Sequence, residues 1–171
     1  MTDKPKMNRA RHHQNFKSDW ETPPELFKLL DARFHFTLDV CAVRETAKCP
    51  QFFSPKENAL VCEWDLETCW MNPPYGVGVT EVWVEKAIAE AREGATVVAL
   101  LPANTSSAWF AQAFNHAAEV IFLVGRVAFL KHKIPVLGNT GGSVIMVFRP
   151  PSARHGPKVV TMWHWRREIS K

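Results

Sequence analysis

The sequence predicts a single α/β domain in which helices cover both faces of a mostly parallel sheet. Segments with helical spacing alternate along the chain with short apolar segments typical of strands, and this alternation is characteristic of parallel sheets. The near-continuous apolar run 95–101 is typical of a strand that is buried on both faces. A length of 171 residues suits one domain with a real hydrophobic core.

The first predicted helix runs from about Pro23 to Arg33. Thr22 has the side chain of an N-cap residue, Pro23 suits the first helical position, and Glu25 would complete a capping box. Leucines at helical spacing then form one apolar stripe. The N-terminus of such a helix leaves backbone N–H groups exposed, which is a natural site for a carboxylate.

Residues 36–40 are expected to form a buried strand with Asp39 near its end. A carboxylate in this position could bind an ammonium or hydroxyl group of a ligand, or it could simply cap a turn, and the local pattern leaves both interpretations open. Residues 48–53 are expected to form a second short strand. Residues 55–64 show no clear pattern.

The tetrad Asn72-Pro73-Pro74-Tyr75 is the clearest functional signal, and it ends a short apolar run. Two consecutive prolines cannot continue a strand, so we expect a rigid, extended loop at a strand's C-terminal end, where open α/β sheets bind ligands. The Asn72 side-chain oxygen and the Pro73 carbonyl could accept both hydrogens of a planar NH2 group, while Tyr75 offers a flat surface for a base. This suits methyl transfer to a conjugated amine. The alternative is a structural turn with a packed tyrosine.

The second half of the chain continues the alternation of helices and strands. We expect the run 95–101 to be followed by another abrupt loop, 102–105, and we expect residues 143–148 to form the final strand of the domain. The remaining expected elements are a helix from Thr80 to about Arg92 that Gly94 ends, a helix that begins at Ser106 or Ser107, a strand over 120–124, and a polar loop before the final strand.

Composition and charge narrow the class of protein. No apolar run approaches the length of a membrane span and no signal peptide is evident, so we expect a soluble, cytoplasmic protein. The four cysteines form no Cys-x-x-Cys pair, which favours free reduced thiols and predicts no metal site. We expect a flexible basic segment at 1–18, the domain at 19–151 and a basic tail at 152–171. The basic ends suit phosphate contacts or mere solubility, and Trp163 and Trp165 in the tail favour nucleic acid.

Several motifs together resemble the phage-type DNA N-6-adenine methyltransferases, a family that depends on S-adenosylmethionine. The resemblance extends from about Ser18 to Pro150, and the ordered set of motifs is more specific than the tetrad alone. The matching segments are Trp20-x-Thr22-Pro23, Phe36-x-Leu38-Asp39-Val40-x-Ala42, Asn58-x-Leu60 with Trp64, Asn72-Pro73-Pro74-Tyr75, Leu101-Pro102-Ala103-Asn104-Thr105, Trp109-Phe110 and Gly125-Arg126-x-x-Phe129.

The resemblance implies a somewhat truncated, Rossmann-like methyltransferase sheet with S-adenosylmethionine across its C-terminal edge. It places Thr22 and Pro23 at the methionine end of the cofactor. The other implied cofactor-binding residues are Asp39 near the ammonium group, Ala42, and Asn58 and Leu60 toward the adenosine. The chain departs from the superfamily because residues 39–42 contain no glycine-rich loop and no acidic ribose ligand is evident, which leaves the exact pose of the cofactor open.

The implied reaction methylates the exocyclic amine of an adenine flipped out of DNA, most naturally double-stranded DNA, in a bacterial host cell. Asn72, Pro73, Pro74 and Tyr75 would form the catalytic loop. Arg126 and Phe129 would contact the substrate, although Phe129 could equally be a core residue. The alternatives are methylation of RNA adenine, cytosine or protein glutamine, and a catalytically silent DNA-binding module. DNA recognition would use the loop 131–142, the two ends or a second subunit, and the sequence is compatible with a monomer or a homodimer.

Overall fold

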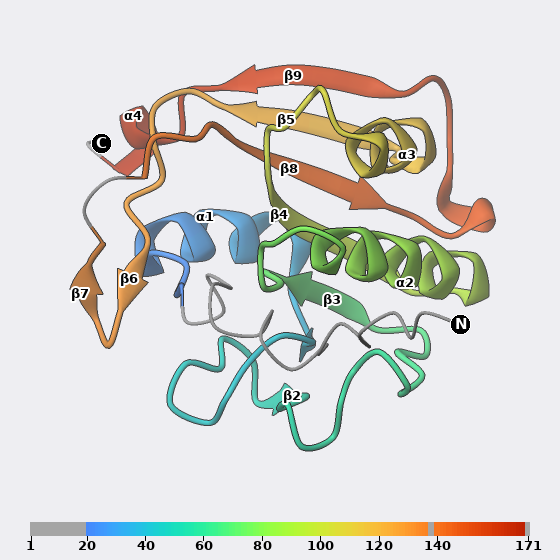
Figure 1. Ribbon diagram of the computed structural model, residues 1–171. Helices are drawn as coiled ribbons and strands as arrows, with labels where there is room; N and C mark the ends of the chain where they lie inside the picture. The colour runs from blue at the N-terminus through green and yellow to red at the C-terminus, as the bar shows by residue number, and fades with distance from the viewer. Residues whose placement is uncertain (1–19, 137–138, 170–171) are drawn as a thin grey trace, which may run out of the picture.

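A computed structural model describes residues 20–136 and 139–169, and it contains the expected mixed α/β fold (Figure 1). Seven strands form one sheet in the order β2-β1-β3-β4-β8-β5-β9, in which only β8 runs antiparallel to its neighbours. These strands are β1 (Leu38–Asp39), β2 (Gln51–Phe52), β3 (Thr68–Met71), β4 (Thr96–Pro102), β5 (Glu119–Leu123), β8 (Ser143–Phe148) and β9 (Val159–Trp163).

Helices pack on both faces of this sheet, as expected. The helices are α1 (Pro24–Phe34), α2 (Val79–Glu93), α3 (Ala108–His116) and the short α4 (Arg166–Ile169), with a 3-10 turn at Pro151–Ala153. Alternate residues of β4 point to opposite faces: Val97 and Leu101 pack with α2 and α3, whereas Val98 and Leu100 pack with α1. Burial on both faces explains why the run 95–101 is almost entirely apolar.

The start of α1 differs from the predicted capping box. The N-cap residue is Pro23, and no side chain caps the helix. Thr22 therefore lies one residue too early to reach the first turn, and its side chain is buried instead. The sequence pattern was misleading because either of two consecutive prolines can occupy the first helical position. The prediction that Thr22 and Glu25 form a capping box is wrong.

Helices α2 and α3 begin within two residues of their predicted starts. Gly78, in a left-handed conformation, is the N-cap of α2, so Thr80 lies inside the first turn, where its hydroxyl bonds the backbone of Gly76. Gly94 ends α2 as expected. The buried Glu90 of α2 forms a 2.5 Å ion pair with Lys86 and accepts the Trp64 backbone N–H at 2.8 Å, so it ties the loop before β3 to the helix.

The C-terminal segment is built into the sheet rather than forming a tail. Residues 159–163 form β9, which pairs in parallel with β5 at the edge of the sheet (Figure 1). The strand 143–148 is therefore not the last strand of the domain. The run Val-Val-Thr-Met-Trp has high β-propensity. Its side chains are mostly exposed and its flanks are basic, so it lacks the apolar pattern from which a buried strand is predicted.

The polar loop before β8 contains a separate two-stranded hairpin, β6 (Leu130–Lys131) and β7 (Ile134–Pro135). Strands of two residues that include a proline carry almost no sequence signal, so this element was not predicted. The predicted N-terminal segment 1–18 lies outside the described residues. Of the helices that the structure does describe, none combines the length and apolar character needed to cross a membrane.

Candidate active site

A cleft of about 870 Å³ opens at the C-terminal edge of the parallel strands. Its size falls in the range of small-molecule sites, roughly 300–1,000 Å³. The walls come from the chain before α1, the segments that follow β1 and β3, the loop around 53–59 and the start of α2. Parallel strands bring these segments to one edge, which is where open α/β sheets bind ligands.

Thr22 lines this cleft next to the N-terminus of α1. Its side chain is 1% exposed, yet its hydroxyl has no hydrogen-bond partner among the described residues. Buried hydroxyl groups are nearly always paired, because an unpaired one loses its bonds to water. The first helical residue is Pro24, which lacks an N–H group, so the Glu25 and Leu26 N–H groups are the first that the helix presents. Together these donors suit an anionic or polar ligand group.

Asp39 lies at the end of β1 and is only 2% exposed. One carboxylate oxygen accepts the Cys41 backbone N–H at 3.1 Å and the other accepts the Lys48 backbone N–H at 3.0 Å. Burial raises the pKa of this carboxyl group, and these two N–H groups partly oppose the rise. Asp39 therefore does cap a turn, while its carboxylate also lines the cleft and retains lone pairs for a cationic ligand group.

Asn72 follows the last residue of β3 and has its side-chain amide fixed at both ends. Its Nδ2 donates to the Trp20 carbonyl at 2.7 Å, and its Oδ1 accepts the Tyr75 hydroxyl at 2.7 Å. The Tyr75 oxygen also lies 2.9 Å from the Leu100 carbonyl oxygen. A carbonyl oxygen has two lone pairs, so Asn72 Oδ1 can still accept one further hydrogen bond. Asn72 and Pro74 both line the cleft, whereas Pro73 is buried beside them.

The ring of Tyr75 packs into an aromatic group with Phe129 and Trp20. Tyr75 meets Phe129 edge to face, with ring centroids 6.1 Å apart, and the ring centroids of Trp20 and Phe129 are 5.1 Å apart. Burial raises the pKa of the Tyr75 hydroxyl well above its ordinary value, so the hydroxyl remains a donor. Phe129 is 2% exposed and does not line the cleft. Of the two interpretations of Phe129, the structure therefore supports core packing.

The other predicted residues divide between the cleft and its surroundings. Ala42 and Asn58 line the cleft, and Asn58 has a left-handed backbone conformation with φ of 57°. Pro23, Leu60 and Arg126 do not line it. Pro23 is buried, and Arg126 is exposed.

Sequence reasoning missed the aromatic walls of the cleft, which are formed by Trp20, Phe53, Trp70 and Trp83. Trp83 offers the clearest missed signal. It belongs to the early turns of α2, which follow the tetrad directly, so this part of the helix must start near the C-terminal edge of the sheet. Trp83 does not belong to the apolar stripe of α2 that faces the core. A large aromatic residue in this position, near the C-terminal edge of the sheet, indicates a wall of the active-site cleft.

The cysteines match the expectation of free thiols. All four are unpaired, and Cys49 and Cys69 are buried. Burial raises the pKa of Cys49 to about 12 and keeps Cys41, which lines the cleft, as a neutral thiol at physiological pH. Within the described residues, no group of three or more His, Cys, Asp or Glu side chains could hold a metal ion.

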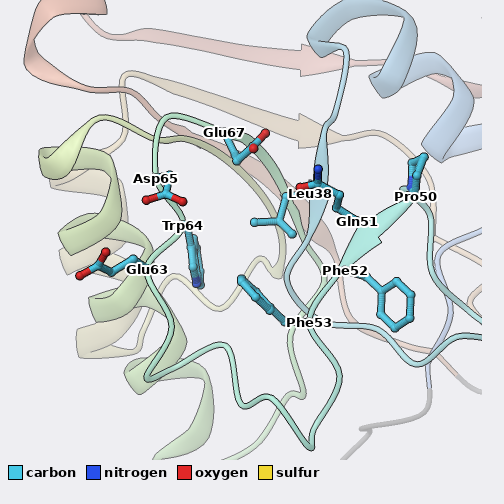
Figure 2. A pocket seen from close by; sticks show the side chains of 9 residues that line it. All are labelled: Leu38, Pro50, Gln51, Phe52, Phe53, Glu63, Trp64, Asp65 and Glu67. Atoms are coloured by element: carbon cyan, nitrogen blue, oxygen red, sulfur yellow. The ribbon is translucent and has the colours of Figure 1, made fainter.

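A second, smaller hollow of about 330 Å³ lies near the start of β1 and β2 (Figure 2). Trp64 and Phe53 present their rings to it, and its remaining side chains include three carboxylates, those of Glu63, Asp65 and Glu67. An acidic rim repels phosphate groups. This hollow is therefore a poor candidate for a nucleotide or nucleic-acid site, and the larger cleft is the candidate active site.

Comparisons with known proteins show the family of the chain. The family described as DNA N-6-adenine-methyltransferase (Dam) matches residues 9–166. A DNA N-6-adenine-methyltransferase of Escherichia phage T1 is 34% identical over 149 residues, which cover 76% of this chain and 62% of that protein. A DNA N-6-adenine-methyltransferase of Haemophilus phage HP1 (strain HP1c1) is 30% identical over 139 residues, which cover 80% of this chain and 76% of that protein. The chain thus spans less than two thirds of the T1 protein. It belongs to the DNA N-6-adenine-methyltransferase (Dam) family.

Proposed function

We propose that the protein transfers a methyl group from S-adenosylmethionine to the exocyclic N6 amine of adenine in double-stranded DNA. The observation that carries the proposal is the Asn72 amide. It is held at both ends, with a lone pair of Oδ1 available, beside a ligand-sized cleft in a chain of this family. The names of both phage relatives describe adenine methylation in DNA.

The size and the lining residues of the cleft are compatible with S-adenosylmethionine. The Thr22 hydroxyl, which has no partner within the part of the chain that the structure describes, and the N-terminus of α1 would bind the carboxylate of its methionine part. The buried Asp39 carboxylate, next to Ala42, would bind the ammonium group, and Asn58 would lie toward the adenosine. When bound, this cofactor supplies an electrophilic methyl group on a sulfonium sulfur. Under this proposal the sheet is of the Rossmann-like methyltransferase type.

The tetrad would hold the acceptor amine. The lone pair of an adenine amine is delocalised into the ring, so the amine is a weak nucleophile. Asn72 Oδ1 and the Pro73 carbonyl would each accept one of its hydrogens and would favour a tetrahedral nitrogen whose lone pair points at the methyl group. The base would be rotated out of the duplex and would stack against the half-buried ring of Tyr75, which lies beside the cleft-lining Asn72 and Pro74. Positioning then supplies much of the acceleration, because both reactants are held in line.

Labelled methyl transfer tests the proposal directly. The purified protein is incubated with labelled S-adenosylmethionine and, in parallel, duplex DNA, RNA or a protein extract, and the products are digested to nucleosides or amino acids. We expect N6-methyldeoxyadenosine from the duplex. Asn72→Ala should lower kcat about 10²–10³-fold, the typical cost of removing one positioned hydrogen-bonding group, and should leave cofactor binding intact. Label only in RNA or protein, or normal turnover by Asn72→Ala, would overturn the proposal.

A further inference from the structure

The β6–β7 hairpin projects from the end of the molecule at which β3, β5 and β9 terminate (Figure 1). Residues 131–135 belong to neither buried cluster of the fold. Lys131, His132 and Lys133 are consecutive and exposed, and the next residue, Ile134, is 68% exposed. The hairpin therefore presents cationic side chains to solvent while contributing little to the core.

The turn of the hairpin is held in an uncommon conformation. His132 and Lys133 have φ values of 51° and 64°, a left-handed region that residues with side chains rarely adopt. Glu21 supports this conformation through an isolated antiparallel bridge to Leu130: its N–H donates to the Leu130 carbonyl at 2.7 Å and its carbonyl accepts the Leu130 N–H at 2.9 Å. The Glu21 carboxylate also accepts the Lys133 backbone N–H at 3.3 Å. Strained residues that neighbours hold in place are typical of functional segments.

The hairpin is directly connected to the candidate active site. His132 and Glu21 both line the cleft. Glu21 follows Trp20, whose carbonyl holds the Asn72 amide. The basic tip thus borders the cleft, and the successive residues Trp20 and Glu21 link it to Asn72.

We propose that the β6–β7 hairpin is the element that grips the DNA backbone beside the target nucleotide, with Lys131 and Lys133 against phosphate groups. This inference rests on the proposed function. Phosphate contacts fix the position of a protein on a duplex and account for much of its affinity. A flipped nucleotide can reach the cleft only if its flanking phosphates come close to the cleft opening, and His132, the residue between these two lysines, lines the cleft. The carboxylates of Glu21 and Glu45 also line the cleft, so cationic residues at its rim are needed to offset them.

The test compares charge removal with charge conservation at the same two positions. The double variants are K131Q/K133Q and K131R/K133R. A matched control, K28Q, changes an exposed lysine of α1 that lines neither cavity. Binding to a fluorescent duplex is measured by anisotropy over a series of salt concentrations. Calorimetry with S-adenosylmethionine and thermal unfolding check that the fold and the cofactor site are preserved.

Each lost phosphate contact should reduce the slope of log K against log salt by about 0.9. We therefore expect K131Q/K133Q to lower that slope by about 1.8 and to weaken duplex binding, with cofactor affinity unchanged. K131R/K133R and K28Q should retain the slope of the unmodified protein. An unchanged slope in K131Q/K133Q would overturn the inference, while methylation of DNA by the unmodified protein would still support the proposed function. Failure of the unmodified protein to methylate DNA would instead overturn the proposed function itself.

Discussion

The Tyr75 hydroxyl provides a sharp test of how Asn72 is positioned. It donates to Asn72 Oδ1 at 2.7 Å and also lies 2.9 Å from the Leu100 carbonyl oxygen. Tyr75→Phe removes this hydroxyl but keeps the ring that packs on Phe129. The substitution therefore separates two possible contributions of Tyr75, namely stacking on the base and orientation of the amide.

The size of the effect follows from the bonds that are lost. A typical hydrogen bond contributes about 1 kcal/mol to stability, and an acceptor left unpaired in a buried position costs about 1–3 kcal/mol. We expect Tyr75→Phe to lower the free energy of unfolding by about 1–2 kcal/mol. In a protein of this size that corresponds to a decrease in Tm of about 2–8 °C. Without this bond Asn72 keeps only its link to Trp20, so kcat should fall about tenfold, which equals about 1.4 kcal/mol of transition-state stabilisation.

Single-turnover methylation of a duplex is measured at saturating and at subsaturating concentrations. The first gives the maximal rate and the second reports the affinity for DNA. Tyr75→Phe should lower the rate at saturation while leaving the affinity for DNA nearly unchanged, because the stacking surface remains. Tyr75→Ala should reduce both quantities. An unchanged rate at saturation in Tyr75→Phe would refute the idea that the hydroxyl orients Asn72. Weaker DNA binding with an unchanged rate would show that the hydroxyl contacts the substrate instead.

Three further predictions concern the cofactor end of the cleft and the core. Thr22→Val removes a buried hydroxyl that has no partner among the described residues. Calorimetry should therefore show about tenfold weaker binding of S-adenosylmethionine, while the free energy of unfolding stays unchanged or rises slightly. A lower free energy of unfolding would contradict this reasoning. Burial raises the pKa of Asp39, so cofactor affinity should fall as the pH decreases from about 7 toward about 4. Asp39→Asn should bind the cofactor weakly at every pH. A similar decline of affinity in that variant would exclude Asp39 as the source of the pH dependence. The raised pKa also means that the contribution of Asp39 to stability is present at low pH and is lost as the pH rises through this range. Glu90→Ala breaks a buried ion pair and the bond to the Trp64 N–H, so chemical denaturation should show a loss of about 3–5 kcal/mol, whereas the exposed Glu85→Ala on the same helix should change stability by less than about 0.5 kcal/mol.

The central part of the fold could be predicted because local and tertiary signals agree there. The run 95–101 is buried on both faces, so its composition matches its environment. The prolines at 73 and 74 end β3 at the position where they interrupt the apolar run. Asp39 was recognised for the same reason, since it follows an apolar segment at a strand end.

The elements that were missed obey weaker or conflicting local signals. β9 is exposed along most of its length and is stabilised by pairing with β5, which sequence periodicity cannot reveal. The β6–β7 hairpin depends on a bridge between Glu21 and Leu130, residues that are far apart in the chain. The predicted N-terminus of α1 is wrong because threonine is a residue type that often caps helices, whereas Thr22 is buried in the wall of the cleft and does not cap α1. Each error concerns a residue whose environment is created by a distant segment.

The same dependence on distant segments shows why the tetrad alone does not make the site. Asn72 is oriented by the backbone of Trp20 from the chain before α1 and by Tyr75, whose oxygen also lies near the Leu100 carbonyl of β4. A short Asn-Pro-Pro-Tyr segment supplies the right atoms, but three segments of the folded chain determine where Oδ1 points. These bonds lie within the protein itself and fix the direction of Oδ1, so the acceptor needs little reorganisation when the substrate arrives. A substitution that displaces residues 20–21 without touching the tetrad should therefore lower kcat even at saturating DNA. The Glu21 contacts to the β6–β7 hairpin are the place to introduce it.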